Sequence, residues 1–198
     1  MVTIIETPGA PNANSYATMA EANTYFENRI PLPVSWVPSG ELQAQALVTA
    51  GRYIDAMASP LTVFIPPTTT GGSRGYYRTR PTWTGKVTTV EQRLAWPRVG
   101  MFDRNGNPIA TIDIPLDLKH AQCEFAGQLL VSDTTLNNDA IAQGISSVSA
   151  GSVSVSFSGM AIPRVWPDAV WNLLVPSWLT QEEISYVRAA QFEFMSTP

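Results

Sequence analysis

The sequence predicts a mainly α-helical protein with a small β component: a compact bundle of about three to four helices with a β-hairpin, a long projecting loop and a carboxyl-terminal arm. Three observations predict this fold. Apolar residues recur at spacings of three and four in three separate segments, as they do on one face of an α-helix. A later segment alternates serine with valine, which is typical of a strand. Between the second and third helical segments, residues rich in proline, glycine and threonine show no apolar period.

The first helix is expected over about residues 19–28. Thr18 and Glu21 have the spacing of a capping box, in which each side chain bonds a backbone amide at the helix start. Met19, Ala22 and Phe26 then lie on one face. The prolines that follow end the helix, because a residue before proline avoids helical geometry.

A second helix is expected over about residues 40–58 and a third over about 115–131. Pro115 opens the third helix, since a proline is well tolerated in a first helical turn. Both helices have one apolar face and must pack against other elements. The apolar positions are Leu47, Ala50, Ile54 and Met57 in the second helix, and Leu118, Ala121, Phe125 and Leu129 in the third.

The segments between and after the helices have their own signals. Residues 60–90 predict the long projecting loop, which by its length is functional or mobile. Asn105-Gly106 predicts a tight turn, because both residues tolerate a positive φ. A β-hairpin is expected over about 145–158, lying on the helices or pairing with a neighbouring subunit. A capping box at Thr180–Glu183 predicts a short helix near the carboxyl end.

The composition limits the classes of protein to consider. Only 14% of the residues are charged, so we expect part of the surface to be covered by partners. The amino terminus lacks the features of a signal peptide, and no apolar run is long enough to span a bilayer. We therefore expect a soluble protein without membrane contact. Cys123 is the one cysteine, so no internal disulfide is expected.

We find no residue set that predicts catalysis, a metal site or a cofactor. His120 and Glu124 lie four residues apart on the third helix, but a metal site needs at least three protein ligands and the chain has one histidine. Cys123 lies on an amphipathic helix, where a buried thiol is expected rather than a nucleophile. A glycine-rich phosphate loop with its lysine is also absent from the sequence. We expect a binding or structural protein rather than an enzyme.

One segment concentrates positive charge in a chain whose net charge is −4. Seven of the 12 lysines and arginines lie between residues 74 and 104, interleaved with aromatic residues. Such interleaving is typical of surfaces that bind single-stranded nucleic acid. The alternative is structural: Trp96 and Arg98 lock a turn, Trp83 packs the loop base, and the free arginines meet acidic partner proteins. We favour this alternative, because an isoelectric point near 4.9 is far from that of an autonomous nucleic-acid binder.

Three strings, taken in order, resemble one known family. The most specific runs from Gln92 through Trp96-Pro97-Arg98 to Ile114-Pro115, and the others are Asn14-Ser15-Tyr16 with the helix after it and residues 45–55. Over roughly residues 1 to 175 the chain is similar to head-tail connector proteins of tailed bacteriophages, the adaptors that complete the head beneath the portal. Some members of this family are labelled DnaT-like single-stranded-DNA-binding proteins.

The resemblance implies a structural virion protein at the head-tail junction, or neck, that is made in the host cytoplasm and forms a dodecameric ring. Its partners would be further copies of itself, the portal protein, and tail, stopper or other neck proteins, with double-stranded DNA passing through the ring. Residues 1–165 would form the connector body and residues 166–198 a docking tail. The alternative function is a single-stranded-DNA-binding accessory protein that uses the segment from Arg74 to Arg104.

Three groups of site residues follow from these expectations. Uncovered apolar residues of the tail would contact the portal: Trp171, Leu174, Trp178, Leu179, Ile184, Val187, Phe192 and Phe194. The projecting loop would contact neighbouring copies or line the DNA channel through Arg74, Tyr76, Tyr77, Arg78 and Arg80. The structural motif would consist of Trp83, Gln92, Trp96, Pro97, Arg98 and Pro115.

Overall fold

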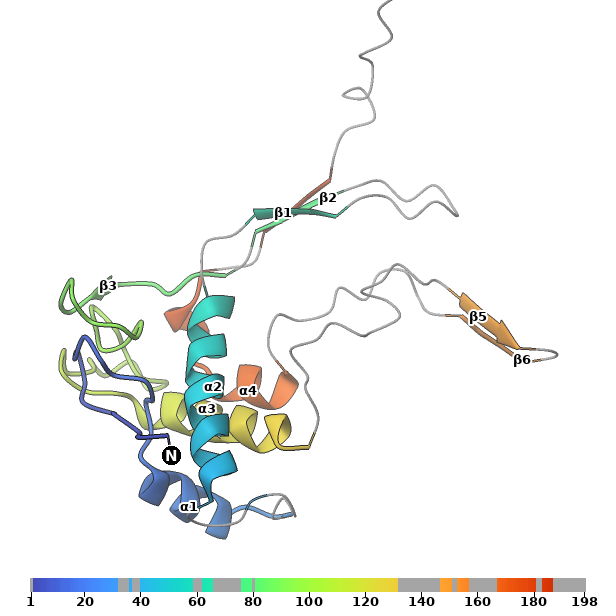
Figure 1. The fold of residues 1–198 in the computed structure, drawn as a ribbon. Coiled ribbons are helices and arrows are strands. Elements are labelled where there is room, and N and C mark those ends of the chain that lie inside the picture. The colour runs from blue at the N-terminus through green and yellow to red at the C-terminus, as the bar shows by residue number, and fades with distance from the viewer. Residues whose placement is uncertain are drawn as a thin grey trace, which may run out of the picture.

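Helices form most of the regular structure in a computed structural model, which describes residues 2–31, 36, 40–58, 62–65, 76–79, 81–131, 147–150, 153–156, 167–180 and 183–186 (Figure 1). The predicted fold class, mainly α with a small antiparallel hairpin, is confirmed. The first three helices begin and end within two residues of the expected positions. The helices are α1 (Met19–Glu27), α2 (Glu41–Met57), α3 (Leu116–Leu129) and α4 (Asp168–Leu173), followed by a 3-10 turn, η1 (Pro176–Trp178).

The strands form three small antiparallel sheets. A three-stranded sheet has the order β1-β2-β7, and two-stranded sheets pair β3 with β4 and β5 with β6. In Figure 1 the β1-β2-β7 sheet and the β5-β6 hairpin both lie away from the helices. The strands are β1 (Thr62–Ile65), β2 (Tyr76–Thr79), β3 (Lys86–Val87), β4 (Arg98–Val99), β5 (Ser147–Ala150), β6 (Val153–Ser156) and β7 (Glu183–Tyr186).

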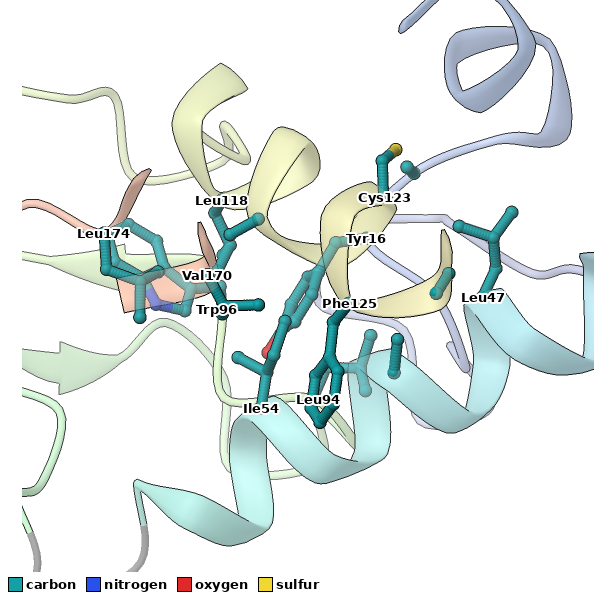
Figure 2. Packing of buried hydrophobic residues seen from close by; sticks show 14 of the residues in the cluster. Tyr16, Leu47, Ile54, Leu94, Trp96, Leu118, Cys123, Phe125, Val170 and Leu174 are labelled. Carbon is teal, nitrogen blue, oxygen red and sulfur yellow. The ribbon is translucent and has the colours of Figure 1, made fainter. Parts of the chain in front are cut away.

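Helix α3 is the centre of the helical body, because α1, α2 and α4 all pack against it. Figure 2 shows the core that forms at these contacts. Leu47 and Ile54 from α2 and Leu118 and Phe125 from α3 are fully buried, as the apolar spacing predicts. Further buried side chains from outside these two helices complete the core, among them Tyr16, Phe26, Leu94, Trp96, Val170, Leu174 and Trp178.

Helix α1 begins as predicted. The Thr18 hydroxyl accepts a hydrogen bond from the Glu21 amide (3.0 Å), and the Glu21 carboxylate accepts one from the Thr18 amide (2.8 Å), which confirms the capping box. The same carboxylate accepts a charge-assisted bond from Lys119 Nζ (2.5 Å). Because Lys119 belongs to α3, one glutamate both starts α1 and attaches it to the central helix.

The turn at Asn105-Gly106 is also confirmed. Gly106 has φ of 82°, a conformation that side chains disfavour. The Asp103 carboxylate accepts bonds from the amides of Asn105 and Asn107, both at 2.8 Å. The Asn107 side-chain amide also donates to this carboxylate (3.0 Å). That side-chain bond, followed by the backbone bonds, lowers the pKa of Asp103, and together the bonds hold the turn.

Two expectations about regular structure need correction. Part of the loop expected over 60–90 is strand, since it contains β1, β2 and β3. The short helix predicted after Thr180 is wrong, because Glu183–Tyr186 is strand β7 and pairs with β2. Thr180 does not cap a helix: its amide donates to the Thr82 carbonyl (2.8 Å), and its hydroxyl accepts from the Thr82 amide (2.9 Å). Pairing between distant segments has overridden the local helical signal.

A single buried carboxamide joins three parts of the body. Gln122 Oε1 on α3 accepts bonds from the amides of Tyr16 and Ala17, each at 2.9 Å. Its Nε2 donates to the Ser15 hydroxyl (2.9 Å) and to the Leu47 carbonyl on α2 (2.7 Å). Gln122 is fully buried, so every polar atom of its side chain must be paired inside the protein, and here each one is.

We predict that Gln122→Leu lowers the free energy of unfolding by about 3 kcal/mol, because it leaves two buried amides without an acceptor. Chemical denaturation followed by far-UV circular dichroism measures this loss. Gln128→Leu, the same change at a half-buried position of α3, is the matched control and should cost far less. Equal losses for the two variants would show that the Gln122 network does not carry the predicted energy.

Candidate functional site

The Trp-Pro-Arg element is built around one arginine. Arg98 is buried, and its guanidinium donates to the carbonyls of Thr84 (2.6 Å), Gly85 (3.0 Å) and Ala95 (3.0 Å). These three bonds use the planar fork of the guanidinium in a way that lysine could not reproduce. Arg98 therefore holds the turn, as the structural alternative expects, and it does not present its charge to solvent.

Gln92 organises the same turn from the other side. Its Oε1 accepts from the amides of Thr88 and Thr89, both at 3.0 Å. Its Nε2 donates to the carbonyls of Leu94 (2.8 Å) and Pro97 (3.1 Å). The structure thus brings Gln92, Trp96, Pro97 and Arg98 into one compact unit, whereas Pro115 lies apart from it as the N-cap of α3.

Three indole rings pack together beside this unit. The centroids of Trp83 and Trp96 are 5.9 Å apart at an interplanar angle of 89°, and those of Trp96 and Trp178 are 4.9 Å apart at 60°. All three side chains are buried, and the Trp178 indole donates to the Phe102 carbonyl (2.7 Å). The indoles of the basic-aromatic segment therefore belong to the core and offer no face on which a base could stack.

A clasp between residues 82–84 and 177–180 covers the indole cluster. Besides the two bonds between Thr82 and Thr180, the Thr84 amide donates to the Trp178 carbonyl (2.8 Å) and the Thr84 hydroxyl to the Ser177 carbonyl (2.9 Å). The clasp continues the pairing of β2 with β7 towards the body. Two distant segments of the chain are thereby joined along one line.

The clasp corrects the expectation that the tail anchors are uncovered. Leu174, Trp178 and Leu179 are buried in the body, and Trp171 packs against it half-buried. They are buried because the body itself supplies their partners, the indole cluster and the Phe102 carbonyl among them. Of the other residues expected to contact the portal, Ile184 lies in β7, while Val187, Phe192 and Phe194 lie outside the described residues.

The remaining cations of the basic segment differ in their surroundings. Arg104 is engaged with the body, since its guanidinium donates to Asp117 (2.8 Å) and to the Asn172 carbonyl (3.1 Å). Lys86 and Arg93 are exposed, and Arg78 lies in β2. Arg74 and Arg80 lie outside the described residues. Between residues 83 and 104, Arg98 is therefore buried, Arg104 is exposed but bonded to the body, and Lys86 and Arg93 are exposed.

The β1-β2-β7 sheet places aromatic residues next to one another. In the paired register, Tyr76 stands between Ile65 and Tyr186, and Tyr77 stands between Phe64 and Ser185. Arg78 stands two positions from Tyr76 on the central strand, and alternate positions of a strand share a face. Tyr76, Tyr186 and Arg78 thus occupy neighbouring positions on one face of the sheet. Tyr186 was missed as a site residue because a helix was expected there, although Glu-Ile-Ser-Tyr alternates as a strand does.

A groove of about 610 Å³ lies between α1 and α3. Glu124 at its side accepts bonds from Arg29 and from the Tyr25 hydroxyl (2.6 Å), and His120 stacks on Tyr25 with ring centroids 4.6 Å apart. Burial raises the pKa of Cys123, which also lines the groove, to about 12, so its thiol remains protonated. The groove therefore offers no activated nucleophile. In the described part of the chain, no three His, Cys, Asp or Glu side chains gather to hold a metal ion.

A buried carboxyl links α2 to the turn. Asp55 accepts a hydrogen bond from the Tyr16 hydroxyl and another from the Ala95 amide (3.0 Å). Burial raises the pKa of Asp55 to about 6, although the two hydrogen bonds and the charge of Arg98 oppose this shift. The same burial, together with the nearby Asp55 carboxyl, raises the pKa of Tyr16.

Among the helices in the described ranges, none has the length and hydrophobicity that crossing a bilayer requires.

A family model described as "Putative DnaT-like ssDNA binding protein" matches residues 73–190. The matched span contains β2 through β7, the Trp-Pro-Arg element, the indole cluster and the clasp, whereas α1 and α2 lie before it. No curated protein and no solved structure matches the chain.

The buried carboxyl of Asp55 makes stability depend on pH. Because the folded-state pKa of about 6 is above the ordinary value of 3.8, the folded protein binds the Asp55 proton more tightly than the unfolded chain. The contribution of Asp55 is therefore full below about pH 4 and is lost as the pH rises towards 6. We predict that the stability of the wild type relative to Asp55→Asn falls through this window and is constant above it.

Denaturation curves of both proteins between pH 3.5 and 7 test this prediction. Asp113→Asn, the same substitution at an exposed aspartate, is the control and should show no such trend. A relative stability that rises with pH would mean that the Asp55 carboxyl is stabilised in its charged form, contrary to the prediction.

Proposed function

The chain belongs to the family of DnaT-like ssDNA-binding proteins, whose model matches more than half of its 198 residues, and from this premise we propose that it binds single-stranded DNA on the β1-β2-β7 sheet. The observation that carries the proposal is the register that sets Tyr76 beside Tyr186, with Arg78 two positions away. Single-strand binding surfaces combine aromatic rings, on which bases stack, with cations that follow the phosphates. This sheet brings both kinds of residue together.

The structure of the body excludes several residues of the basic-aromatic segment from DNA binding. Trp83 and Trp96 are in the core, Arg98 bonds three carbonyls, and Arg104 bonds Asp117. The proposed surface is therefore the amino-terminal part of the basic-aromatic segment, together with β7. On the sheet it consists of Tyr76, Arg78 and Tyr186. Arg74 and Arg80, which flank β2 in the sequence and lie outside the described residues, are proposed to add charge to it.

The charge of the whole protein determines how such binding would behave. With a net charge of −4, the protein as a whole repels a phosphate backbone, so attraction must come from the local cluster of cations. Base stacking would then supply the part of the affinity that salt does not remove. Sequence preference would be weak, because every base offers a face for stacking.

We predict that replacing Arg74, Arg78 and Arg80 with glutamine weakens binding of a labelled oligothymidylate. Each lost phosphate contact reduces the salt dependence, so the slope of log affinity against log salt should become shallower by about 2. Fluorescence anisotropy over a series of salt concentrations measures both quantities.

The matched control replaces Arg52, Lys86 and Arg93, three exposed cations of the body, with glutamine, which gives the same net charge. It should bind like the wild type. Tyr186→Leu extends the test to the sheet and should weaken binding by about 1 to 3 kcal/mol. Equal losses in the two triple variants, or a wild type that binds no single strand, would refute the proposed surface.

A second candidate function is the head-tail connector, and a specific observation favours it. Among the described elements, the β1-β2-β7 sheet and the β5-β6 hairpin pack substantially only within themselves and stand apart from the helical body (Figure 1). A small body with outlying β elements and 14% charged residues suits a subunit whose surface is shared with neighbours. In this candidate function the protein forms a ring under the portal, and DNA passes through the ring without being held.

Light scattering on a sizing column distinguishes the two functions. If the protein is a connector, mixing it with the portal protein of the same phage yields a particle that contains both. A chain truncated after Tyr186 keeps β7 and the clasp, and should lose this association if residues 187–198 are the docking tail. Persistent portal binding by the truncated chain would rule out that tail, and no complex at all would rule out the connector.

A further inference from the structure

Within the part of the chain that the structure describes, the β5-β6 hairpin does not pack substantially on another element. Among the described elements, β5 and β6 make substantial contact only with each other. Figure 1 shows the pair well separated from α2, α3 and α4. A two-stranded ribbon is at best marginally stable in water, and it needs a third strand or a covering face. A partner strand or face would therefore stabilise the hairpin, and the other described elements do not supply one.

The register of the hairpin is self-complementary. Val148 pairs with Val155, Ser147 with Ser156, and Ser149 with Ser154. Since alternate positions share a face, the valine positions form one row across the strands and the serine positions another. A further strand of the same sequence, added in the same register, would extend both rows. The sequence is thus suited to pairing with itself.

Nothing in the hairpin sequence prevents such pairing. Proteins protect exposed strand edges with charged residues, especially lysine, or with proline. From Ile145 to Phe157 the chain has neither a charged residue nor a proline. The absence of lysine and arginine also argues against a phosphate backbone as the occupant, because cations dominate that recognition.

We infer that the hairpin is a self-association surface, on which an edge strand of one copy pairs with an edge strand of a second copy. Both hairpin edges are equivalent in composition, so β5 of one copy can pair with β6 of the next. Head-to-tail contacts of this kind close into rings when the rotation between copies permits it. The inference concerns self-association alone and holds under either function proposed above.

The test measures the mass of the full chain by light scattering over a range of concentrations. The wild type should have a mass that is a multiple of the 21.5 kDa of one chain. Val155→Lys places a charge in the valine row and should reduce the mass to that of one chain at the same concentration. Val90→Lys, the same substitution at a valine that is 91% exposed on the body, is the control and should keep the wild-type mass.

A second variant distinguishes loss of association from misfolding. Replacing residues 147–156 with a glycine-serine linker removes the hairpin, which the helices do not need, so the helical circular dichroism should persist while the association is lost. A multimer that survives in both hairpin variants would overturn the inference. A wild type with the mass of one chain at every concentration would overturn it equally, and the anisotropy experiments on the arginine variants would be unaffected.

A spectroscopic experiment locates the contact. Cys123 is the one native cysteine and is buried, so a Cys123→Ala, Ser154→Cys chain takes a single nitroxide label in β6. Pairing of copies should broaden its spectrum, and dilution with unlabelled protein should remove the broadening. A spectrum that shows no broadening in the multimer would place the contact elsewhere and reject the hairpin as the surface.

Discussion

The carboxamide of Gln122 is the interaction on which the rest of the body depends. Helix α3 contacts every other helix, and the amino-terminal segment carries Tyr16 into its core. That segment has no helix or strand to satisfy its backbone amides before α1 begins, and Gln122 accepts from two of them. Leu would fill the same space but would leave these groups unpaired. At the other end of Tyr16, the Asp55 carboxyl of α2 accepts a hydrogen bond from the Tyr16 hydroxyl. Polar side chains of two helices therefore fix both the backbone and the hydroxyl of Tyr16.

Local signals predicted the elements whose hydrogen bonds are local. Thr18 and Glu21 bond each other, Asp103 bonds residues two and four positions away, and Pro115 stands at the start of its helix. Thr180 has the same Thr-x-x-Glu spacing as Thr18, yet it bonds Thr82. Nothing near Thr180 in the sequence reveals that partner. The site shows the same limit: spacing identified the tryptophans and arginines between 83 and 104, but only tertiary packing decides that Trp96 and Arg98 point inward.

The molecule consists of a helical body, whose parts are joined by buried polar side chains such as Gln122, and of small β-sheets that lie away from it. The body buries the residues that looked most suited to binding, the tryptophans, and keeps exposed cations such as Lys86 and Arg93 on its surface. The strands of the β1-β2-β7 sheet and of the β5-β6 hairpin, in contrast, make substantial contact only within their own sheets among the described elements. Such strands would gain stability from a partner, whether a nucleic acid or another subunit, because small isolated sheets are at best marginally stable in water.

The clasp between Thr82-Thr84 and Trp178-Thr180 turns the chain between them into a closed loop of roughly 95 residues, and closing a loop of that length costs about 4 kcal/mol in chain entropy. Burial of Trp178 and the hydrogen bonds of the clasp offset this cost. Contacts of low sequence separation, such as α3 with the turn before it, can form earlier. We expect the clasp to be among the last contacts to form and among the first to open. The pairing of β2 with β7 lies directly beyond it, so we expect β7 to join the β1-β2 pair late in folding, after the body has formed.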